Sequence, residues 1–166
     1  MISSRRLPRP DAVSQDWPAL DQILLMLRLL EWEPTDAQWP LFQAIANRSA
    51  RTIGVFGGER SGKSAAGTAA VACCLPACEL VWLLAPDYKQ ARAEFEYLQD
   101  YLLKLGVVDP KNISMHFAEQ CHLTTNWGAK VETKSSTDPT KIASFAPDVI
   151  LMVEAGQQPY MAFLKA

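Results

Sequence analysis

A glycine-rich segment of eight residues constrains this chain more than any other feature of its sequence. In order, the residues are Gly57, Gly58, Glu59, Arg60, Ser61, Gly62, Lys63 and Ser64. They match G-x-x-x-x-G-K-[ST], the pattern of a loop whose glycines let backbone N–H groups turn inward around a phosphate. In that pattern the lysine reaches the β- and γ-phosphate oxygens, and the final hydroxyl binds Mg²⁺. The segment therefore predicts a site for ATP with Mg²⁺.

The residues on either side of this segment predict the fold around it. An apolar run precedes it and small residues follow it, while the continuous apolar runs 80–85 and 149–153 are typical of parallel strands buried on both faces. Strands that alternate with helices predict an α/β fold with a mostly parallel sheet, whose ligands bind at the carboxyl ends of the strands. Periodicity and turn signals predict helices over 16–31, 35–49, 63–75 and 88–105, strands over 51–56, 80–85, 113–117, 121–125, 130–135 and 149–153, a helical turn within 136–145 and a helix start over 159–166.

Length and composition indicate one globular domain. The chain has 166 residues, of which 49% are apolar and 20% charged, so it can form a real core. Its net charge of −2 lacks the basic excess of a free-standing nucleic-acid binder. No apolar run approaches the ~20 residues of a membrane helix, and no signal-peptide pattern is present. We expect an intracellular protein with a flexible tail over 1–15 and one domain over 16–166.

The cysteines and histidines do not have the spacing of a zinc site. The cysteines are Cys73, Cys74, Cys78 and Cys121, and the histidines are His116 and His122. A zinc site needs C-x₂₋₄-C pairs with matched partners, which these positions do not supply. We expect reduced cysteines packed as small apolar residues, and Pro76 ends the helix that carries the first two.

Five sequence motifs occur in the order found in one protein family. They are Gln38, the glycine-rich segment 57–64, residues 86–88, residues 134–136 and the segment 148–159, which contains Glu-Ala-Gly-Gln-Gln-Pro. Together they resemble the ATPase domain of phage terminase large subunits, the motors that pump DNA into viral capsids. The resemblance covers about residues 35–165 and implies a P-loop NTPase core.

The resemblance also implies roles for particular residues. Lys63 would hold the β- and γ-phosphates, Ser64 would bind Mg²⁺, and Glu154 would polarise the attacking water as the catalytic base. Arg60 would sense or stabilise the γ-phosphate, or instead form a salt bridge with Glu59 or another carboxylate.

A second implied role concerns the nucleotide base. Gln38 lies 19 residues before Gly57 and matches the family's adenine-binding glutamine. Trp39 or Phe42 would offer the base a surface. The alternative for Gln38 is a solvated helix residue.

The chain departs from the family pattern at the catalytic strand. The family usually has Asp before the glutamate, where it helps to hold Mg²⁺, but here that position is Val153. Asp148 lies five residues earlier, roughly 16 Å away along a strand, and cannot replace it. Asp87 either approaches the metal or caps the helix that follows it.

A further departure concerns the end of the ATPase domain. In related ATPases, the strand that follows the glutamate lies between the phosphate-loop strand and the glutamate strand. Neither this strand nor the family's nuclease domain follows in this sequence. We therefore expect a fragment truncated after the glutamate strand, incomplete as an ATPase domain and poorly stable when isolated.

The resemblance finally implies partners and a location, and leaves alternatives open. It implies double-stranded DNA, the portal protein and the small terminase subunit as partners, in a homo-oligomeric ring at the procapsid portal in the host cytoplasm. The alternatives are an ATP-binding remnant or regulator that does not hydrolyse ATP, and a helicase-like P-loop NTPase. For Lys130, Lys134 and Lys141, we expect a solvated hairpin face, with DNA contact as the alternative.

Overall fold

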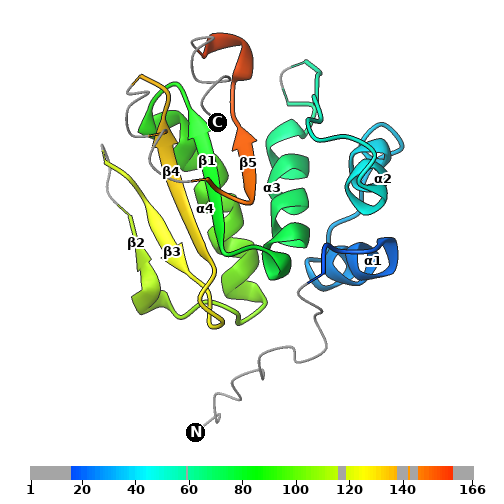
Figure 1. Ribbon diagram of the computed structural model, residues 1–166, viewed down its shortest axis with the longest axis horizontal. Helices are drawn as coiled ribbons and strands as arrows, with labels where there is room; N and C mark the ends of the chain where they lie inside the picture. Colours follow the sequence, from blue (N-terminus) through cyan, green and yellow to red (C-terminus); the bar gives the residue numbers. More distant parts are fainter. Residues whose placement is uncertain (1–15, 59, 116–118, 138–141, 143–145, 159–166) are drawn as a thin grey trace, which may run out of the picture.

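The computed structural model describes residues 16–58, 60–115, 119–137, 142 and 146–158, with a sheet flanked by helices (Figure 1). The predicted tail 1–15, the predicted helix start 159–166 and most of the predicted turn 136–145 lie outside these residues. The longer helices are α1 (Leu20–Leu29), α2 (Trp39–Asn47), α3 (Lys63–Cys74) and α4 (Tyr88–Lys104). The strands are β1 (Leu80–Ala85), β2 (Ile113–Ser114), β3 (His122–Thr124), β4 (Lys130–Ser135) and β5 (Val149–Met152). The described residues also include three 3₁₀ turns: η1 (Leu75–Ala77), η2 (Pro110–Asn112) and η3 (Ala155–Gln157).

The sheet is mixed, with a parallel core. The five strands lie in the order β2-β3-β4-β1-β5. Strand β1 pairs in parallel with β4 on one side and with β5 on the other. Strand β3 pairs antiparallel with β2 and with β4, and the predicted hairpin between β3 and β4 is confirmed. The predicted α/β class with a mostly parallel core is therefore confirmed.

The strand predicted over residues 51–56 is not formed, and that prediction is wrong. Residues 53–58 have no regular secondary structure. The side chains of Val55 and Phe56 are 41% and 93% exposed. A strand needs a neighbour about 4.8 Å away that satisfies its backbone groups. Among the described residues, the edge strand β5 pairs only with β1. Residues 51–56 therefore have no neighbouring strand with which to form backbone hydrogen bonds.

Local signals fix the ends of helix α4. Asp87 is the N-cap, and its side chain accepts a hydrogen bond from the backbone N–H of Gln90 at 2.8 Å. Gly106 follows the last turn with φ of 67°, and its N–H and that of Val107 donate to carbonyls of the last turn. Because glycine adopts the left-handed conformation without a steric penalty, the helix ends as predicted.

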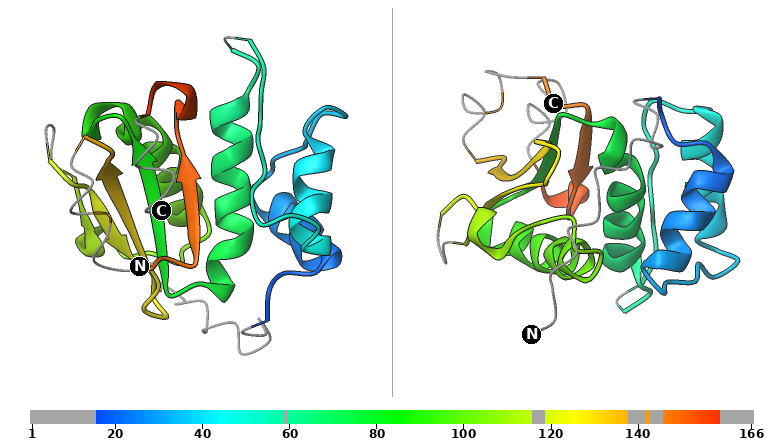
Figure 2. Two further views of the ribbon diagram at one scale, coloured as in Figure 1. Left: turned by 45° about the horizontal axis from the view of Figure 1, so that its top comes forward. Right: turned by 90° about the horizontal axis from the view of Figure 1, so that it is seen from below.

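Helix α3 is enclosed on several sides. The sheet and α4 lie on one side of it, and α1 and α2 pack on the other, as the two views in Figure 2 show. All residues from Ala66 to Cys74 are buried. A helix in this position needs small side chains, since neighbours approach it from several directions. This explains the run of alanine and glycine that follows Ser64.

The core has two parts, one on each face of the sheet. Val81 and Leu83 of β1 face the large cluster that includes α3 and α4. Trp82 and Leu84 face the other side, where Ile142 packs against them. This alternation is the period-2 pattern of a strand buried on both faces.

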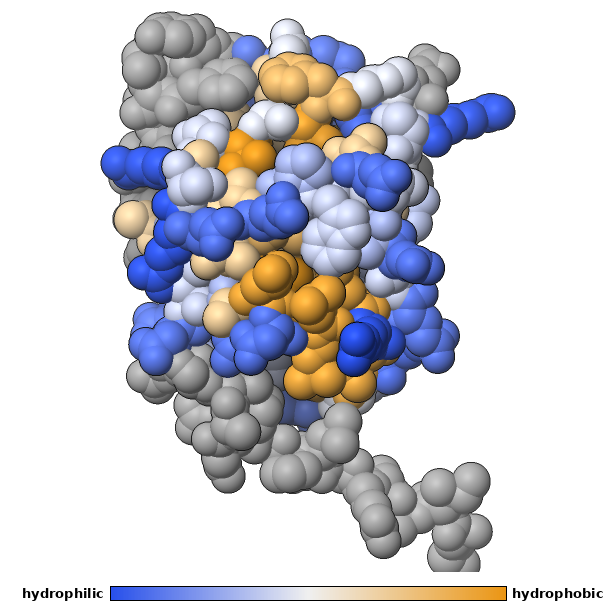
Figure 3. Space-filling model, turned by 90° about the vertical axis from the view of Figure 1, so that its right-hand side faces the viewer, coloured by the Kyte–Doolittle hydropathy of each residue, from blue (hydrophilic) through white to orange (hydrophobic). Residues whose placement is uncertain are grey.

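Helices α1 and α2 form the outer side of the molecule. Figure 3 shows an apolar patch on this side, and the exposed large apolar residues of α1 are Leu20, Leu25 and Leu29. None of the described helices has the length and apolar character needed to cross a membrane.

The four cysteines are buried, as predicted. Within the part of the chain that the structure describes, no three His, Cys, Asp or Glu side chains gather as a metal site. Burial raises the pKa of Cys73 and of Cys78 to about 12, which keeps both thiols protonated at neutral pH.

Candidate functional site

The glycine-rich segment forms the turn that leads into helix α3. Figure 1 shows this turn at the same end of the molecule as the carboxyl ends of β1 and β5. Gly62 is the N-cap of α3 with φ of 78°, a conformation that favours glycine. Arg60 also has a positive φ, of 59°, and its side chain is exposed. Glu59 lies outside the described residues, so the predicted Arg60–Glu59 salt bridge is not tested.

The ammonium group of Lys63 lies over this turn. Its Nζ donates hydrogen bonds to the carbonyl oxygens of Gly57 at 2.7 Å and Gly58 at 2.6 Å. A third, weaker contact of 3.5 Å joins it to the hydroxyl of Ser61. The lysine therefore holds the turn closed while keeping its positive charge at the start of α3.

The N-terminus of α3 has no side-chain cap. The carbonyl of Gly62 accepts the first helical hydrogen bond, from the N–H of Ala66 at 2.9 Å. No side chain caps the helix, and its first turn carries no acidic residue. The free N–H groups and the partial positive charge of a helix N-terminus, together with Lys63, favour an anion at this position.

Gln38 contacts the end of the glycine-rich segment, although it is distant in sequence. Its Nε2 lies 3.5 Å from the carbonyl oxygen of Gly62. Its Oε1 accepts a hydrogen bond from the backbone N–H of Thr35 at 2.9 Å. The structure thus brings Gln38 beside the predicted phosphate site, and the side chain is only half-buried.

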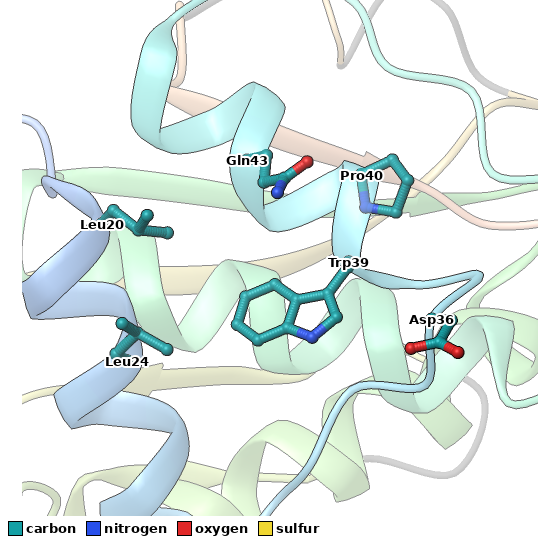
Figure 4. A pocket seen from close by; sticks show the side chains of 6 residues that line it. All are labelled: Leu20, Leu24, Asp36, Trp39, Pro40 and Gln43. Carbon is teal, nitrogen blue, oxygen red and sulfur yellow. The ribbon is translucent and has the colours of Figure 1, made fainter.

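Trp39 and Phe42 differ in what they offer a ligand. Phe42 is fully buried, so the prediction that it presents a surface to a base is wrong. It packs inward because it meets both Trp32 and Trp39 in the core between α1 and α2. Trp39 lines an open hollow of about 500 Å³ (Figure 4). The other residues that line this hollow are Leu20, Leu24, Asp36, Pro40 and Gln43.

Glu154 follows strand β5 and lies at the turn into η3. Its φ is 49° and its side chain is exposed. Gln157 contacts its carboxylate, with Nε2 3.3 Å from Oε2. Gln158 is buried and donates from Nε2 to the carbonyls of Leu84 at 3.0 Å and Val153 at 2.7 Å. The two glutamines of the Glu-Ala-Gly-Gln-Gln-Pro segment therefore fix the turn that presents Glu154.

Neither aspartate considered as a replacement at Val153 takes that role. The carboxylate of Asp148 accepts hydrogen bonds from the N–H groups of Glu79 and Leu80, at 2.7 and 3.0 Å. This contact lies at the other end of β5, as the sequence predicts. Asp87 caps α4. The backbone N–H of Val153 donates a hydrogen bond to the carbonyl of Leu84 at 2.8 Å, which extends the pairing of β5 with β1. The side chain of Val153 has no atom that binds a metal.

The lysines of the hairpin do not form a free basic face. The side chain of Lys134 is only 13% exposed, pairs with Glu132 at 2.8 Å and lies over the ring of Trp82. Its amine is therefore engaged within the protein, which fits neither the expected solvated face nor the alternative of DNA contact at this lysine. Lys130 is exposed, whereas Lys141 lies outside the described residues.

Sequence reasoning missed one buried acidic residue, Glu94 on helix α4. Its side chain is buried, with a residue exposure of only 4%. Burial raises the pKa of this carboxyl group, the polar side chain of Ser64 lowers it, and the negative charge of Glu154 raises it. One carboxylate oxygen, Oε2, has no hydrogen-bond partner.

A signal for Glu94 was present in the sequence. The buried face of α4 consists of Ala91, Glu94, Phe95, Leu98 and Leu102. A glutamate in an apolar stripe at helical spacing is unusual, because charged groups are seldom fully buried without a partner. Its position on the helix was therefore predictable, but its neighbours were not.

The fold is that of an α/β protein in which the turn that leads into α3 and the turn that follows β5 lie at the same end of the molecule, beyond the carboxyl ends of the parallel strands (Figure 1). No protein-family model, curated protein or solved structure matches this chain.

Proposed function

We propose that this chain binds ATP with Mg²⁺ at residues 57–64 and is the N-terminal ATPase portion of a terminase large subunit. The observation that carries the proposal is the position of the Lys63 ammonium at the uncapped N-terminus of α3. A triphosphate requires this combination of a positive charge and free N–H donors.

When a nucleotide binds, the ammonium group of Lys63 exchanges its hydrogen bonds to backbone carbonyls for hydrogen bonds to phosphate oxygens. In the structure its donors are satisfied by two neutral carbonyl oxygens. Phosphate oxygens are charged acceptors and form stronger hydrogen bonds with an ammonium group. Arg60, exposed at the same turn, offers a second positive charge to the phosphates.

The residues around Ser64 suit a cation that takes few protein ligands. Mg²⁺ commonly keeps several waters and binds one or two protein groups together with substrate phosphates. The exposed Ser64 supplies one oxygen ligand of the right kind, and the carboxylate of Glu154 lies exposed after β5. When bound, Mg²⁺ would neutralise negative charge on the phosphates.

Glu154 suits the role of general base for hydrolysis. Its carboxylate is exposed at the end of β5, and it can accept a proton from a water molecule. The hydrogen bond from Gln157 orients it without neutralising it. Gln38, against Gly62, is proposed to contact the adenine.

The assignment to a DNA-packaging motor rests on the resemblance of the five sequence motifs. This resemblance implies the proposed partners, which are double-stranded DNA, the portal protein, the small terminase subunit and further copies of this chain in a ring. Contacts between motifs far apart in sequence support a shared site. For example, Ser135 donates a hydrogen bond from Oγ to the carbonyl of Pro86 at 2.8 Å.

A second candidate function is ATP binding without hydrolysis. Two observations favour it: Val153 offers no ligand to a metal, and residues 53–58 before the turn are not held in the sheet. A helicase-like P-loop NTPase is the third candidate, and the Glu-Ala-Gly-Gln-Gln-Pro segment favours the terminase over it.

Calorimetry with ATP and Mg²⁺ tests the binding proposal. We expect Lys63→Ala to weaken binding about 100-fold, since charge-assisted hydrogen bonds contribute roughly 1.5–3 kcal/mol each. Lys104→Ala is the matched control, because it removes the same charge from an exposed ion pair with Glu31 at the far end of α4. Equal affinities in wild type, Lys63→Ala and Lys104→Ala would refute the site.

Hydrolysis distinguishes the first candidate from the second. Where wild type turns over ATP, Glu154→Gln should abolish turnover and preserve binding, since the amide keeps the size of the side chain but is not a base. Measurable binding with no turnover in wild type would support the non-hydrolysing candidate. Full turnover by Glu154→Gln would show that another group activates the water.

A further inference from the structure

The hollow between α1 and α2 combines an aromatic ring with apolar side chains. In Figure 4, Leu20 and Leu24 reach from α1 toward the indole ring of Trp39 on α2. Phe42 packs against this ring from the core, at an interplanar angle of 81°, and Trp39 itself is only partly buried. The side chain of Leu20 is 43% exposed. The hollow is therefore an accessible surface that offers an indole and two leucines to a ligand.

Asp36 adds a negative charge to this hollow. Its side chain is exposed, and it forms no ion pair with any residue in the described part of the chain. A carboxylate beside an indole suits a cationic ligand, because a guanidinium group pairs with carboxylates and also stacks on aromatic faces. The segment 20–47, which holds both helices, is acidic as a whole. Its charged residues are Asp21, Glu31, Glu33 and Asp36 against Arg28.

The chain itself contains a segment with the complementary chemistry. Residues 5–10 are Arg-Arg-Leu-Pro-Arg-Pro. Proline favours the extended polyproline II helix, and proline-rich peptides of this kind bind in aromatic-lined grooves. Because proline fixes φ, such a segment also loses less conformational entropy on binding than a flexible one. Its apolar residues match the indole and the leucines, and its arginines match Asp36.

The described part of the chain begins close enough to the hollow for this segment to reach it. Nε1 of Trp17 donates a hydrogen bond to the carbonyl oxygen of Ile45 at 2.8 Å, which fixes Trp17 at the C-terminal end of α2. Trp39 precedes Ile45 by six residues on α2, which is about 9 Å along the helix axis. Residues 11–16 span up to about 20 Å when extended. They are therefore long enough to return residues 5–10 to the hollow.

We propose that residues 5–10 bind in the hollow between α1 and α2, with proline against the indole of Trp39 and arginine paired with Asp36. The tether holds the segment at a local concentration on the order of 1 mM, so a site with a dissociation constant of about 1 mM is about half occupied. This interaction surface is separate from the proposed nucleotide site and does not depend on it.

A nitroxide label tests the proposal on the full chain. Ser4→Cys places the label beside the segment, and the native cysteines are buried, so the reagent should react at position 4 alone. The readout is the NMR signal of the Trp39 indole N–H, compared before and after reduction of the nitroxide. Trp39→Phe identifies this signal among those of the five tryptophans. Asp36→Lys is the test variant, and Asp100→Lys on α4 is the matched control, since Asp100 is also exposed.

We expect the nitroxide to remove much of the Trp39 signal in the labelled chain and in its Asp100→Lys variant. Asp36→Lys should recover this signal, because a like charge now faces the arginines. Dispersed amide signals would show that each variant is folded. An undiminished Trp39 signal in the labelled chain would overturn the proposal. So would an equal loss in Asp36→Lys, since a freely moving segment passes the hollow whatever its charge.

Two further samples identify the occupant of the hollow. In a mixture of nitroxide-labelled chains with unlabelled, isotope-enriched chains, only contacts between copies weaken the Trp39 signal. A loss in that mixture would assign the hollow to a second copy and overturn binding of the chain's own segment. A synthetic peptide of residues 3–12 should recover the signal at millimolar concentration, whereas the same peptide with serine in place of its three arginines should not. Equal effects of the two peptides would contradict the role of the arginines.

Discussion

Helix α3 and strand β5 meet at Gly67, and this contact sets the spacing of the candidate site. A Cβ added at Gly67 would lie 3.0 Å from Cδ1 of Leu151, closer than ordinary van der Waals contact. Helix α3 carries Lys63 and Ser64, and β5 leads to Glu154. A larger residue at position 67 would therefore push apart the two elements that supply the site.

We expect Gly67→Val to destabilise the protein by about 1–3 kcal/mol through overpacking. The better helix propensity of valine offsets only a few tenths of a kcal/mol. Gly67→Ala should be near neutral, because a gain of about 1 kcal/mol in helix propensity opposes one close contact that Leu151 relieves by a small shift. For a chain of this size, 2 kcal/mol corresponds to a melting-temperature change of roughly 4–8 °C.

The assay is urea unfolding followed by circular dichroism, with a double-mutant cycle. Leu151→Ala should cost about 2 kcal/mol by itself, the low end for a leucine that is only half-buried. In Gly67→Val/Leu151→Ala the space left by the leucine should accept the valine, so the double variant should be at least 1 kcal/mol more stable than the sum of the single changes predicts. Additivity within about 0.5 kcal/mol would refute the close approach of α3 to β5.

Three other predictions follow from the described contacts. Asp148→Asn should lower the free energy of unfolding by about 1–3 kcal/mol, because the carboxylate accepts two backbone N–H groups that join the starts of β5 and β1; an unchanged urea midpoint would contradict this. Burial raises the pKa of Cys73 and Cys78 to about 12, so about one thiol in 10⁴ is ionised at pH 8, and native alkylation by iodoacetamide should be far slower than in urea. Because the folded thiols hold their protons more tightly, the free energy of unfolding should also fall as the pH rises above about 9, and rapid native alkylation would contradict the burial. Val153→Asp should lower the melting temperature without metal and tighten the Mg²⁺ dependence of hydrolysis, since it places a second acid next to Glu154; no change in either quantity would show that position 153 does not face the site.

The sequence by itself determined the elements whose causes are local. Asp87 and Gly106 bound helix α4 because a side-chain cap and a left-handed glycine act within a few residues. The apolar runs of β1 and β5 and the glycine-rich turn before α3 were likewise predictable from a short window. The grouping of the glycine-rich segment with Glu154 followed from the rule that ligands bind at the carboxyl ends of parallel strands.

Only the tertiary structure decided which segments gained partners. Residues 53–56 are as apolar as a strand requires, but no neighbouring strand satisfies their backbone, so they remain outside the sheet. The position of Glu94 in the apolar stripe of α4 could be read from the sequence, but its burial arises from the packing of α4 on α3 and the sheet. Strand pairing and burial depend on residues far apart in the chain, and the free energy of such contacts belongs to neither segment alone.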